Sequence, residues 1–397
     1  MKTMILGTVA AVALVGAGGC SFIKGLASLG SEDEMVFTVD MEAFDVKSIQ
    51  LTRVDEGGPL CIGGTAMVKI TAEAFDKTTR KDVTLETSGK KVTSKDHDKM
   101  DPTEFAMQAR DGTIENGKFT ASSDPFAGLL GYDVKATYRM DKSKEATVHF
   151  EPSYACIGAI GSAGESGSRG MRGERGAQNG GAGGPGGPGG PGGPGPSLTA
   201  YVSIVETPLF DRVGVVKVTG GAETMTLFDL ATGITVVASG GAGGRGGSGG
   251  DGGPGPKPRG SGGQGGIGGD GGPGGDGGQL VLIVDERFPE LRSAVKIDVG
   301  GGPGGGGGSS GQGGQGSPSY RECSNCALTP AGPRGPSGSP GQSNPTSGRP
   351  GASETRDEDV SAAFSSLPPG VRLRTDARVE KEAEPPPPPP PSKGKKK

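Results

Sequence analysis

Apolar and polar residues alternate with a period of two in the N-terminal third of the chain, the pattern of half-buried β-strands. The alternation occurs in four stretches, 35–41, 66–74, 132–140 and 146–150. Between them, Asn116-Gly117 is a dipeptide typical of a two-residue hairpin turn, and it predicts a hairpin over 113–119. We therefore predict a β-sandwich over residues 31–157.

A second group of short, β-branched runs lies between residues 197 and 299 and predicts a second, smaller β domain. The expected strands are 199–205, 213–218, 225–230, 234–238, 280–284 and 294–299. Residues 240–279 interrupt this group with Gly-Gly-X triplets on both sides of a proline-rich turn. Matched arms about a turn, with strands at either end, favour a glycine-rich hairpin arm that leaves the sheet and returns to it. The alternative is disorder, because glycine loses much backbone entropy on ordering.

Glycine also recurs at every third residue elsewhere. Residues 158–178 have one glycine per triplet and 180–196 read mostly Gly-Gly-Pro, so we expect 158–196 to be a spacer between the two domains. Residues 300–397 contain further glycine triplets, a polar stretch, seven consecutive prolines and a final lysine cluster. This composition predicts a tail that is largely disordered.

These motifs resemble known repeats. The one-glycine triplets of 158–178 resemble bacterial collagen-like proteins, and the Gly-Gly-X triplets of 240–279 resemble the polyglycine II bundles of snow-flea antifreeze proteins and certain phage tail adhesins. The strand pattern of 31–157 is similar to immunoglobulin-like modules of bacterial surface proteins. The resemblances imply a mainly β protein with a polyglycine II-like arm.

The first twenty residues have the form of an export signal, with Lys2 followed by a short apolar run. The run ends in Ala17-Gly18-Gly19-Cys20, which resembles the lipobox of bacterial lipoproteins, although Ala17 replaces the usual Leu or Val. The resemblance implies a signal peptide over 1–19, lipidation of Cys20, a linker over 20–30 and anchoring in a membrane. Ser21 follows the cysteine. An aspartate at this place would resemble an inner-membrane retention signal, so its absence favours the outer membrane or cell surface.

Four further cysteines are Cys61, Cys156, Cys323 and Cys326. In an exported protein an even number suggests disulfides, and four cysteines allow three pairings. The positions favour Cys61 with Cys156, which bracket the N-terminal domain, and Cys323 with Cys326. Zinc at Cys323 and Cys326 would need two more ligands, and neither histidine lies nearby.

Composition narrows the functional classes. The chain has 397 residues, of which 81 are glycine and 32 proline, with no tryptophan and a net charge of −4. This charge does not indicate nucleic-acid binding. His97 and His149 lie in polar patterns, and the familiar hydrolase and zinc-protease motifs are missing. We expect no metal and no cofactor.

The sequence thus predicts a non-catalytic lipoprotein of the cell envelope with a structural or adhesive role. Its partners would be the membrane, through the lipid anchor, and peptidoglycan or a surface polysaccharide. One alternative is a module that binds polysaccharide or ice through flat Gly-Gly-X faces. Another is an enzyme with a carboxylate pair in 31–157. The oligomeric state stays open.

Overall fold

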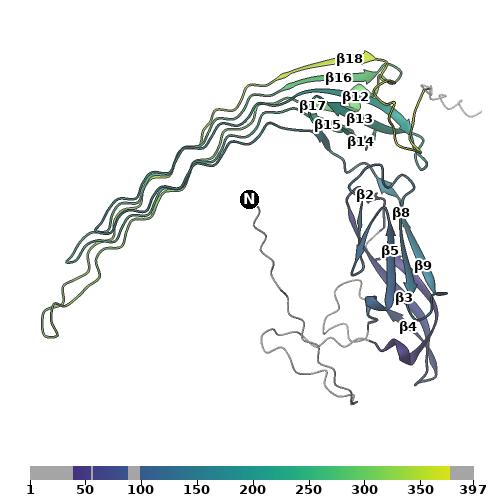
Figure 1. The fold of residues 1–397 in the computed structure, drawn as a ribbon, viewed down its shortest axis with the longest axis horizontal. Helices are drawn as coiled ribbons and strands as arrows, with labels where there is room; N and C mark the ends of the chain where they lie inside the picture. The colour runs from purple at the N-terminus through teal and green to yellow at the C-terminus, as the bar shows by residue number, and fades with distance from the viewer. Residues whose placement is uncertain (1–38, 55–56, 88–98, 376–397) are drawn as a thin grey trace, which may run out of the picture.

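A computed structural model describes residues 39–54, 57–87 and 99–375. The described chain is mainly β, as predicted, and its strands form several open sheets. Figure 1 shows an N-terminal β-rich part, a second β-rich part beside it, and a long bundle of extended segments that leaves the second part.

The N-terminal part contains a five-stranded and a three-stranded sheet. The first sheet comprises β1 (Phe44–Arg53), β3 (Thr65–Asp76), β4 (Lys81–Glu86), β6 (Gly112–Glu115) and β7 (Lys118–Ala121). The second comprises β5 (Phe105–Arg110), β8 (Tyr132–Tyr138) and β9 (Glu145–Phe150). Two short strands, β2 (Leu60–Cys61) and β10 (Pro152–Ser153), pair in parallel, and two 3₁₀ turns are η1 (Met41–Ala43) and η2 (Pro102–Glu104).

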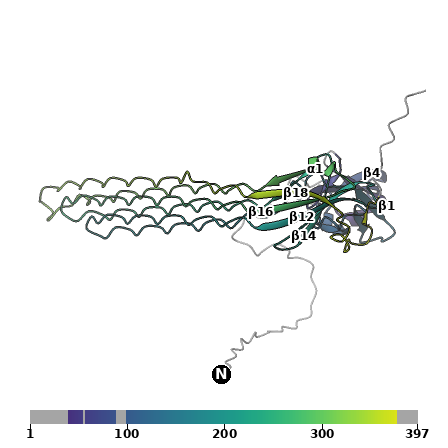
Figure 2. The same cartoon turned by 90° about the horizontal axis from the view of Figure 1, so that it is seen from above.

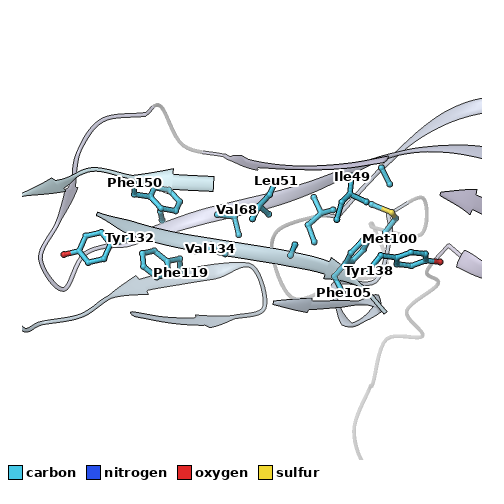
Figure 3. Close-up of a cluster of buried hydrophobic side chains, with 14 of the residues drawn as sticks. Ile49, Leu51, Val68, Met100, Phe105, Phe119, Tyr132, Val134, Tyr138 and Phe150 are labelled. Carbon is cyan, nitrogen blue, oxygen red and sulfur yellow. The ribbon is translucent and has the colours of Figure 1, made fainter. Parts of the chain in front are cut away.

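The alternation that predicted these strands also builds their core. Along β8 every second residue from Tyr132 to Tyr138 is buried. Phe119 and Phe150 stack with ring centroids 5.5 Å apart, and Figure 3 shows both beside Tyr132. The predicted hairpin is confirmed: Asn116 and Gly117 have φ of 49° and 76°, as its tight turn requires. The strand predicted over 35–41 is wrong over its described part: Val39 and Asp40 form no strand, and Met41 begins η1. Residues 35–38 lie outside the described residues.

The second β-rich part has two sheets packed face to face. The larger contains β12 (Ser197–Glu206), β13 (Val213–Thr219), β14 (Thr224–Phe228), β16 (Gln279–Asp285), β18 (Ala352–Glu358) and β19 (Arg372–Leu373). The smaller contains β11 (Ala159–Gly161), β15 (Ile234–Val237) and β17 (Val295–Asp298), which run parallel, and one helical turn, α1 (Leu291–Ala294), precedes β17. Aliphatic residues of both sheets, such as Val202, Val236 and Leu282, share one core. The six strands predicted over 197–299 are all present.

Between these strands the chain makes three long hairpins of glycine-rich segments, which we number I to VI and together call the glycine bundle. The segments are I (162–177), II (181–196), III (238–256), IV (260–278), V (299–317) and VI (331–351). Segments I, III and V leave the smaller sheet, and II, IV and VI return to the larger one. Figure 2 shows them side by side along their whole length.

The bundle corrects two sequence predictions and enlarges a third. Residues 158–196 are not a spacer between domains, because they supply β11 and the first hairpin. The arm at 240–279 is the middle hairpin of three. The predicted tail over 300–397 is ordered as far as residue 375: segments V and VI complete the bundle, and β18 extends the larger sheet. The reason is the same in each case, since a glycine segment that looks unstructured alone finds hydrogen-bond partners in distant segments. Residues 376–397 lie outside the described residues.

Candidate functional site: the glycine bundle and its two faces

The bundle has no apolar core and is held by backbone hydrogen bonds. In segment III the amide of Gly244 donates to the carbonyl of Gly190 at 2.8 Å, and the amide of Gly243 donates to the carbonyl of Pro303 at 2.8 Å. The pattern repeats at every third residue along the segment. Two of the three amides in a Gly-Gly-X triplet therefore bond to two different neighbours.

Glycine is required at these positions because the segments approach too closely for a side chain. A Cβ built on Gly247 would lie 1.9 Å from the carbonyl oxygen of Met171, and one on Gly269 would lie 1.9 Å from the oxygen of Gly187. Both oxygens belong to backbone that is itself hydrogen-bonded across the bundle, so neither can move away cheaply.

The number of glycines per triplet follows the number of neighbours. Segments III and IV each bond to four other segments and II and V to three, whereas I and VI bond to two. Segments II to V are built mainly of Gly-Gly-X triplets, and I and VI have one glycine per triplet. The triplets that resemble collagen are thus the edges of this bundle, where only one residue in three faces another segment.

The third residue of each triplet faces solvent. Gly306 occupies such a position, and nothing lies within 4 Å of a Cβ built on it. Proline fills the third position four times in segment II, at Pro185, Pro188, Pro191 and Pro194, all exposed. Proline suits this place because the bundle needs no amide donor there and its ring already holds φ near −65°.

Since segments I, III and V form one layer and II, IV and VI the other, the bundle presents two outward faces. The layer of II, IV and VI carries the four prolines, and we call it the proline face. On the opposite layer, segment I has arginine at the third position of three successive triplets. We call this the arginine face and define it by Arg169, Arg172, Arg175, Arg245, Asp251 and Gln312.

Aspartates at third positions link neighbouring segments on both faces. On the arginine face, Asp251 of segment III accepts the backbone N–H of Gln312 of segment V at 2.9 Å and pairs with Arg172 of segment I at 3.3 Å. On the proline face, Asp270 and Asp276 accept N–H groups of segment VI at 2.8 and 2.7 Å. A carboxylate on either face is therefore held by an outward amide of the next segment.

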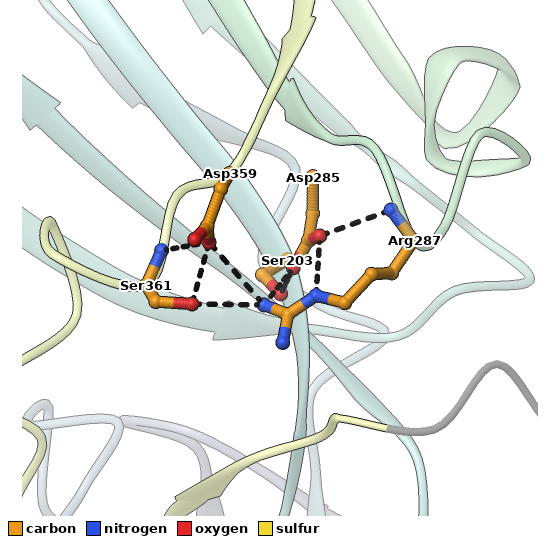
Figure 4. Close-up of polar contacts among 5 residues, drawn as sticks. All are labelled: Ser203, Asp285, Arg287, Asp359 and Ser361. Atoms are coloured by element: carbon orange, nitrogen blue, oxygen red, sulfur yellow. Dashed lines mark hydrogen bonds and ion pairs between the residues drawn. The ribbon is translucent and has the colours of Figure 1, made fainter.

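A buried polar cluster lies in the larger sheet around Asp285, the last residue of β16 (Figure 4). Asp285, which is fully buried, accepts two hydrogen bonds from the guanidinium of Arg287 at 2.8 Å each and one from the hydroxyl of Ser203. Arg287 also reaches Ser361. This hydrogen bonding to Asp285 raises the pKa of Arg287. Because Arg287 contacts Asp285 of β16 as well as Ser361, the cluster holds the 359–361 segment onto the sheet.

His149 lies on the polar side of β9, as the alternation predicts. Its Nδ1 is 2.7 Å from Asp133 Oδ1, and the other oxygen of Asp133 is 2.8 Å from Arg110. Within the described residues, no serine hydroxyl and no cysteine thiol is hydrogen-bonded to His149 or Asp133. His97 lies outside the described residues. In the described part of the chain, no three His, Cys, Asp or Glu side chains converge as a metal site would require.

The cysteines pair as the sequence favoured. Cys61 and Cys156 have Cα atoms 5.7 Å apart, and Cys323 and Cys326 have theirs 5.1 Å apart, both suitable for disulfides. The first pair joins the end of β2 to the segment that follows β10. The second closes a small loop between segments V and VI, at the far end of the bundle. Cys20 lies outside the described residues.

Sequence reasoning identified the repeats but missed the arginine face. The period of three in Arg169, Arg172 and Arg175 was a readable signal, whereas Asp251 and Gln312 come together with it only in the folded bundle. No helix within the described ranges is long and apolar enough to cross a membrane. Comparison with protein families, with curated proteins and with solved structures yields no significant match.

Proposed function

We propose that the protein is a non-catalytic lipoprotein of the cell envelope whose glycine bundle is a rigid arm with a structural or adhesive role. The observation that carries the proposal is the cross-bonding of six segments at every third residue, with a β-strand adjoining each segment at the sheet end. Such an arm presents long faces (Figure 2), which suit contact with an extended partner.

We further infer that the arm is of the polyglycine II type. A period of three in the hydrogen bonds is what a left-handed threefold helix gives, and at about 3.1 Å per residue the arm reaches roughly 50 Å. Ordering glycine costs about 1–2 kcal/mol per residue, so only dense lateral bonding can offset it. We also propose that the N-terminal part is an immunoglobulin-like sandwich. It would be the module between the lipid anchor and the arm.

The anchor is the lipidated Cys20, exposed by removal of the signal peptide over 1–19, in the outer membrane or on the cell surface. Two cysteine pairs at disulfide distance support an oxidising compartment outside the cytoplasm. Metabolic labelling with palmitate, followed by membrane fractionation, tests the anchor. We expect label on the wild type and none on Cys20→Ser, which should leave the membrane fraction. An unlabelled wild type would contradict the anchor.

The role of the arm is tested in cells with a matched pair of substitutions. Gly247→Val places a side chain against the backbone of segment I, whereas Gly306→Val points into solvent. Both variants should reach the surface at similar levels, which surface labelling can verify. We expect surface attachment or cell–cell contact to fall with Gly247→Val alone. Attachment unchanged by Gly247→Val, with the bundle disrupted, would contradict an adhesive arm.

A further inference from the structure

The arginine face carries a regular row of exposed positive side chains. Arg169, Arg172 and Arg175 are exposed and recur at every third residue, so their Cα atoms follow one another at about 9 Å when the rise is about 3.1 Å per residue. Arg245 of segment III adds a fourth charge beside them. The second positions of segment I, including Glu165 and Glu174, bond through their carbonyls to segment II, and their side chains are exposed along the outer edge of the bundle.

The protein itself shows how this face holds a carboxylate. Asp251 lies between two segments, with Oδ2 3.3 Å from Arg172 Nη2 and Oδ1 2.9 Å from the backbone N of Gln312. One guanidinium and one outward amide thus act on the same carboxylate. Both contacts are charge-assisted, and their geometry comes from the register of three segments.

The same arrangement recurs one triplet closer to the sheets, without a carboxylate from the protein. The residues equivalent to Arg172, Asp251 and Gln312 are Arg169, Ser248 and Ser309, because all three segments run in the same direction. Ser248 is small, so Arg169 and the amide of Ser309 are left to a carboxylate supplied from outside.

We propose that the arginine face binds an anionic polysaccharide that carries carboxylates at regular intervals. The proposal rests on the proposed function and names the partner of the arm. Arg172 in the middle of the row already pairs with Asp251. Arg169 and Arg175, which lie about 19 Å apart along the same face, are therefore left for carboxylates that recur along a sugar chain. Arginine suits this role because its planar fork matches a carboxylate.

Charge density and side-chain type favour a polysaccharide over a nucleic acid. Duplex DNA carries a charge about every 1.7 Å, far more closely than this row. Proteins that bind single strands stack bases on aromatic rings, and the residues that define the arginine face include none.

The first experiment measures binding of the full chain to hyaluronate, in which carboxylated and uncharged sugars alternate, with dextran as the neutral reference. The double variant Arg169→Gln/Arg175→Gln removes two charges from the row. Arg349→Gln removes an exposed charge from segment VI, on the opposite face. We expect binding to weaken roughly tenfold in the double variant and to stay unchanged in Arg349→Gln. Binding should also weaken as salt rises.

A second pair of variants tests the carboxylate geometry directly. Ser248→Asp supplies the protein's own carboxylate to Arg169, so it should weaken hyaluronate binding about threefold while the melting temperature is kept. Ser339→Asp makes the same change on the proline face and should have less effect. Asp251→Asn releases Arg172 and should strengthen binding about twofold.

Three results would overturn the proposal. They are equal binding of hyaluronate and dextran by the wild type, equal loss in Arg349→Gln and in the double variant, and duplex DNA binding more tightly than hyaluronate with the same arginine dependence. Failure here is distinguishable from failure of the arm itself. If Gly247→Val impairs attachment in cells and Arg169→Gln/Arg175→Gln does not, the arm stands and its partner is another.

Discussion

At the scale of single residues, the bundle depends on glycines that differ sharply in their surroundings. In Gly247→Ala the new Cβ would lie 1.9 Å from a hydrogen-bonded carbonyl oxygen, whereas in Gly306→Ala it would meet nothing within 4 Å. We expect the first to lower the free energy of unfolding by about 2 kcal/mol and the second to change it by less than about 0.5 kcal/mol. Urea denaturation measures both, and equal stability of the two variants would contradict the close packing.

Tyr132 is a second residue with an unusual environment. Its ring is fully buried and its hydroxyl has no hydrogen-bond partner. Burial, with the charges of Asp111 and Asp124, raises the pKa of this phenol to about 12. Because the folded state resists losing the proton, the stability contribution is complete below pH 10 and falls as the pH rises toward 12.

The phenol can be tested by a conservative replacement. Tyr132→Phe removes a buried, unpartnered hydroxyl, so its stability at pH 8 should equal or exceed that of the wild type by about 1 kcal/mol. Between pH 10 and 12 the variant should lose less stability than the wild type. Urea denaturation of both proteins at pH 8 and at pH 11 measures this difference. A variant that loses as much stability at high pH as the wild type would rule out Tyr132 as the cause of the loss.

At the scale of elements, the two disulfides differ in the length of chain that they close. Cys61 and Cys156 are 95 residues apart, and Cys323 and Cys326 are three apart. Loop-closure entropy predicts that Cys61→Ser/Cys156→Ser costs about 5 kcal/mol and Cys323→Ser/Cys326→Ser about 2 kcal/mol. Circular dichroism during urea unfolding can rank them, and the opposite order would contradict the entropic account.

The edge segments also close the bundle to further growth. Segment I presents four second-position side chains where another segment could otherwise add, at Glu165, Ser168, Met171 and Glu174. Replacing all four with glycine restores a surface that a second molecule can bond, as an unprotected sheet edge does. Sedimentation should then show association that increases with concentration. Replacing four third-position prolines of segment II instead serves as the control and should not promote it.

At the scale of the whole molecule, the bundle continues the two sheets of the second β-rich part. The strands β11, β15 and β17 lead into segments I, III and V, and the larger sheet receives the returning segments. Each hairpin begins and ends in a strand of these sheets (Figure 1). The pairing register of the strands therefore sets the register between neighbouring segments of the arm.

This architecture predicts a gradient of amide protection. Segments III and IV have four neighbours and should exchange most slowly, whereas segments I and VI have two and should exchange faster. Hydrogen exchange followed by mass spectrometry resolves the segments as separate peptides. Uniformly fast exchange across the bundle would contradict a cross-bonded arm.

The strands were largely predictable, because alternation is a local property. Tyr132 to Tyr138 is buried at every second residue as its pattern indicates, and Asn116-Gly117 makes the expected turn. The tail was not predictable in the same way. A glycine segment such as V carries no apolar pattern, so its order depends on partners in IV and III that the local sequence does not reveal.

The residues alone establish a mainly β chain and triplets of two kinds, and they favour the two cysteine pairings. Six distant segments lie side by side in the bundle. This packing decides at which positions only glycine fits and which third positions face a partner. The physical reason is that strands and turns depend on contacts near in sequence, whereas the bundle depends on backbone bonds between distant parts of the chain. The arginine face exists only because that packing aligns Arg172, Asp251 and Gln312.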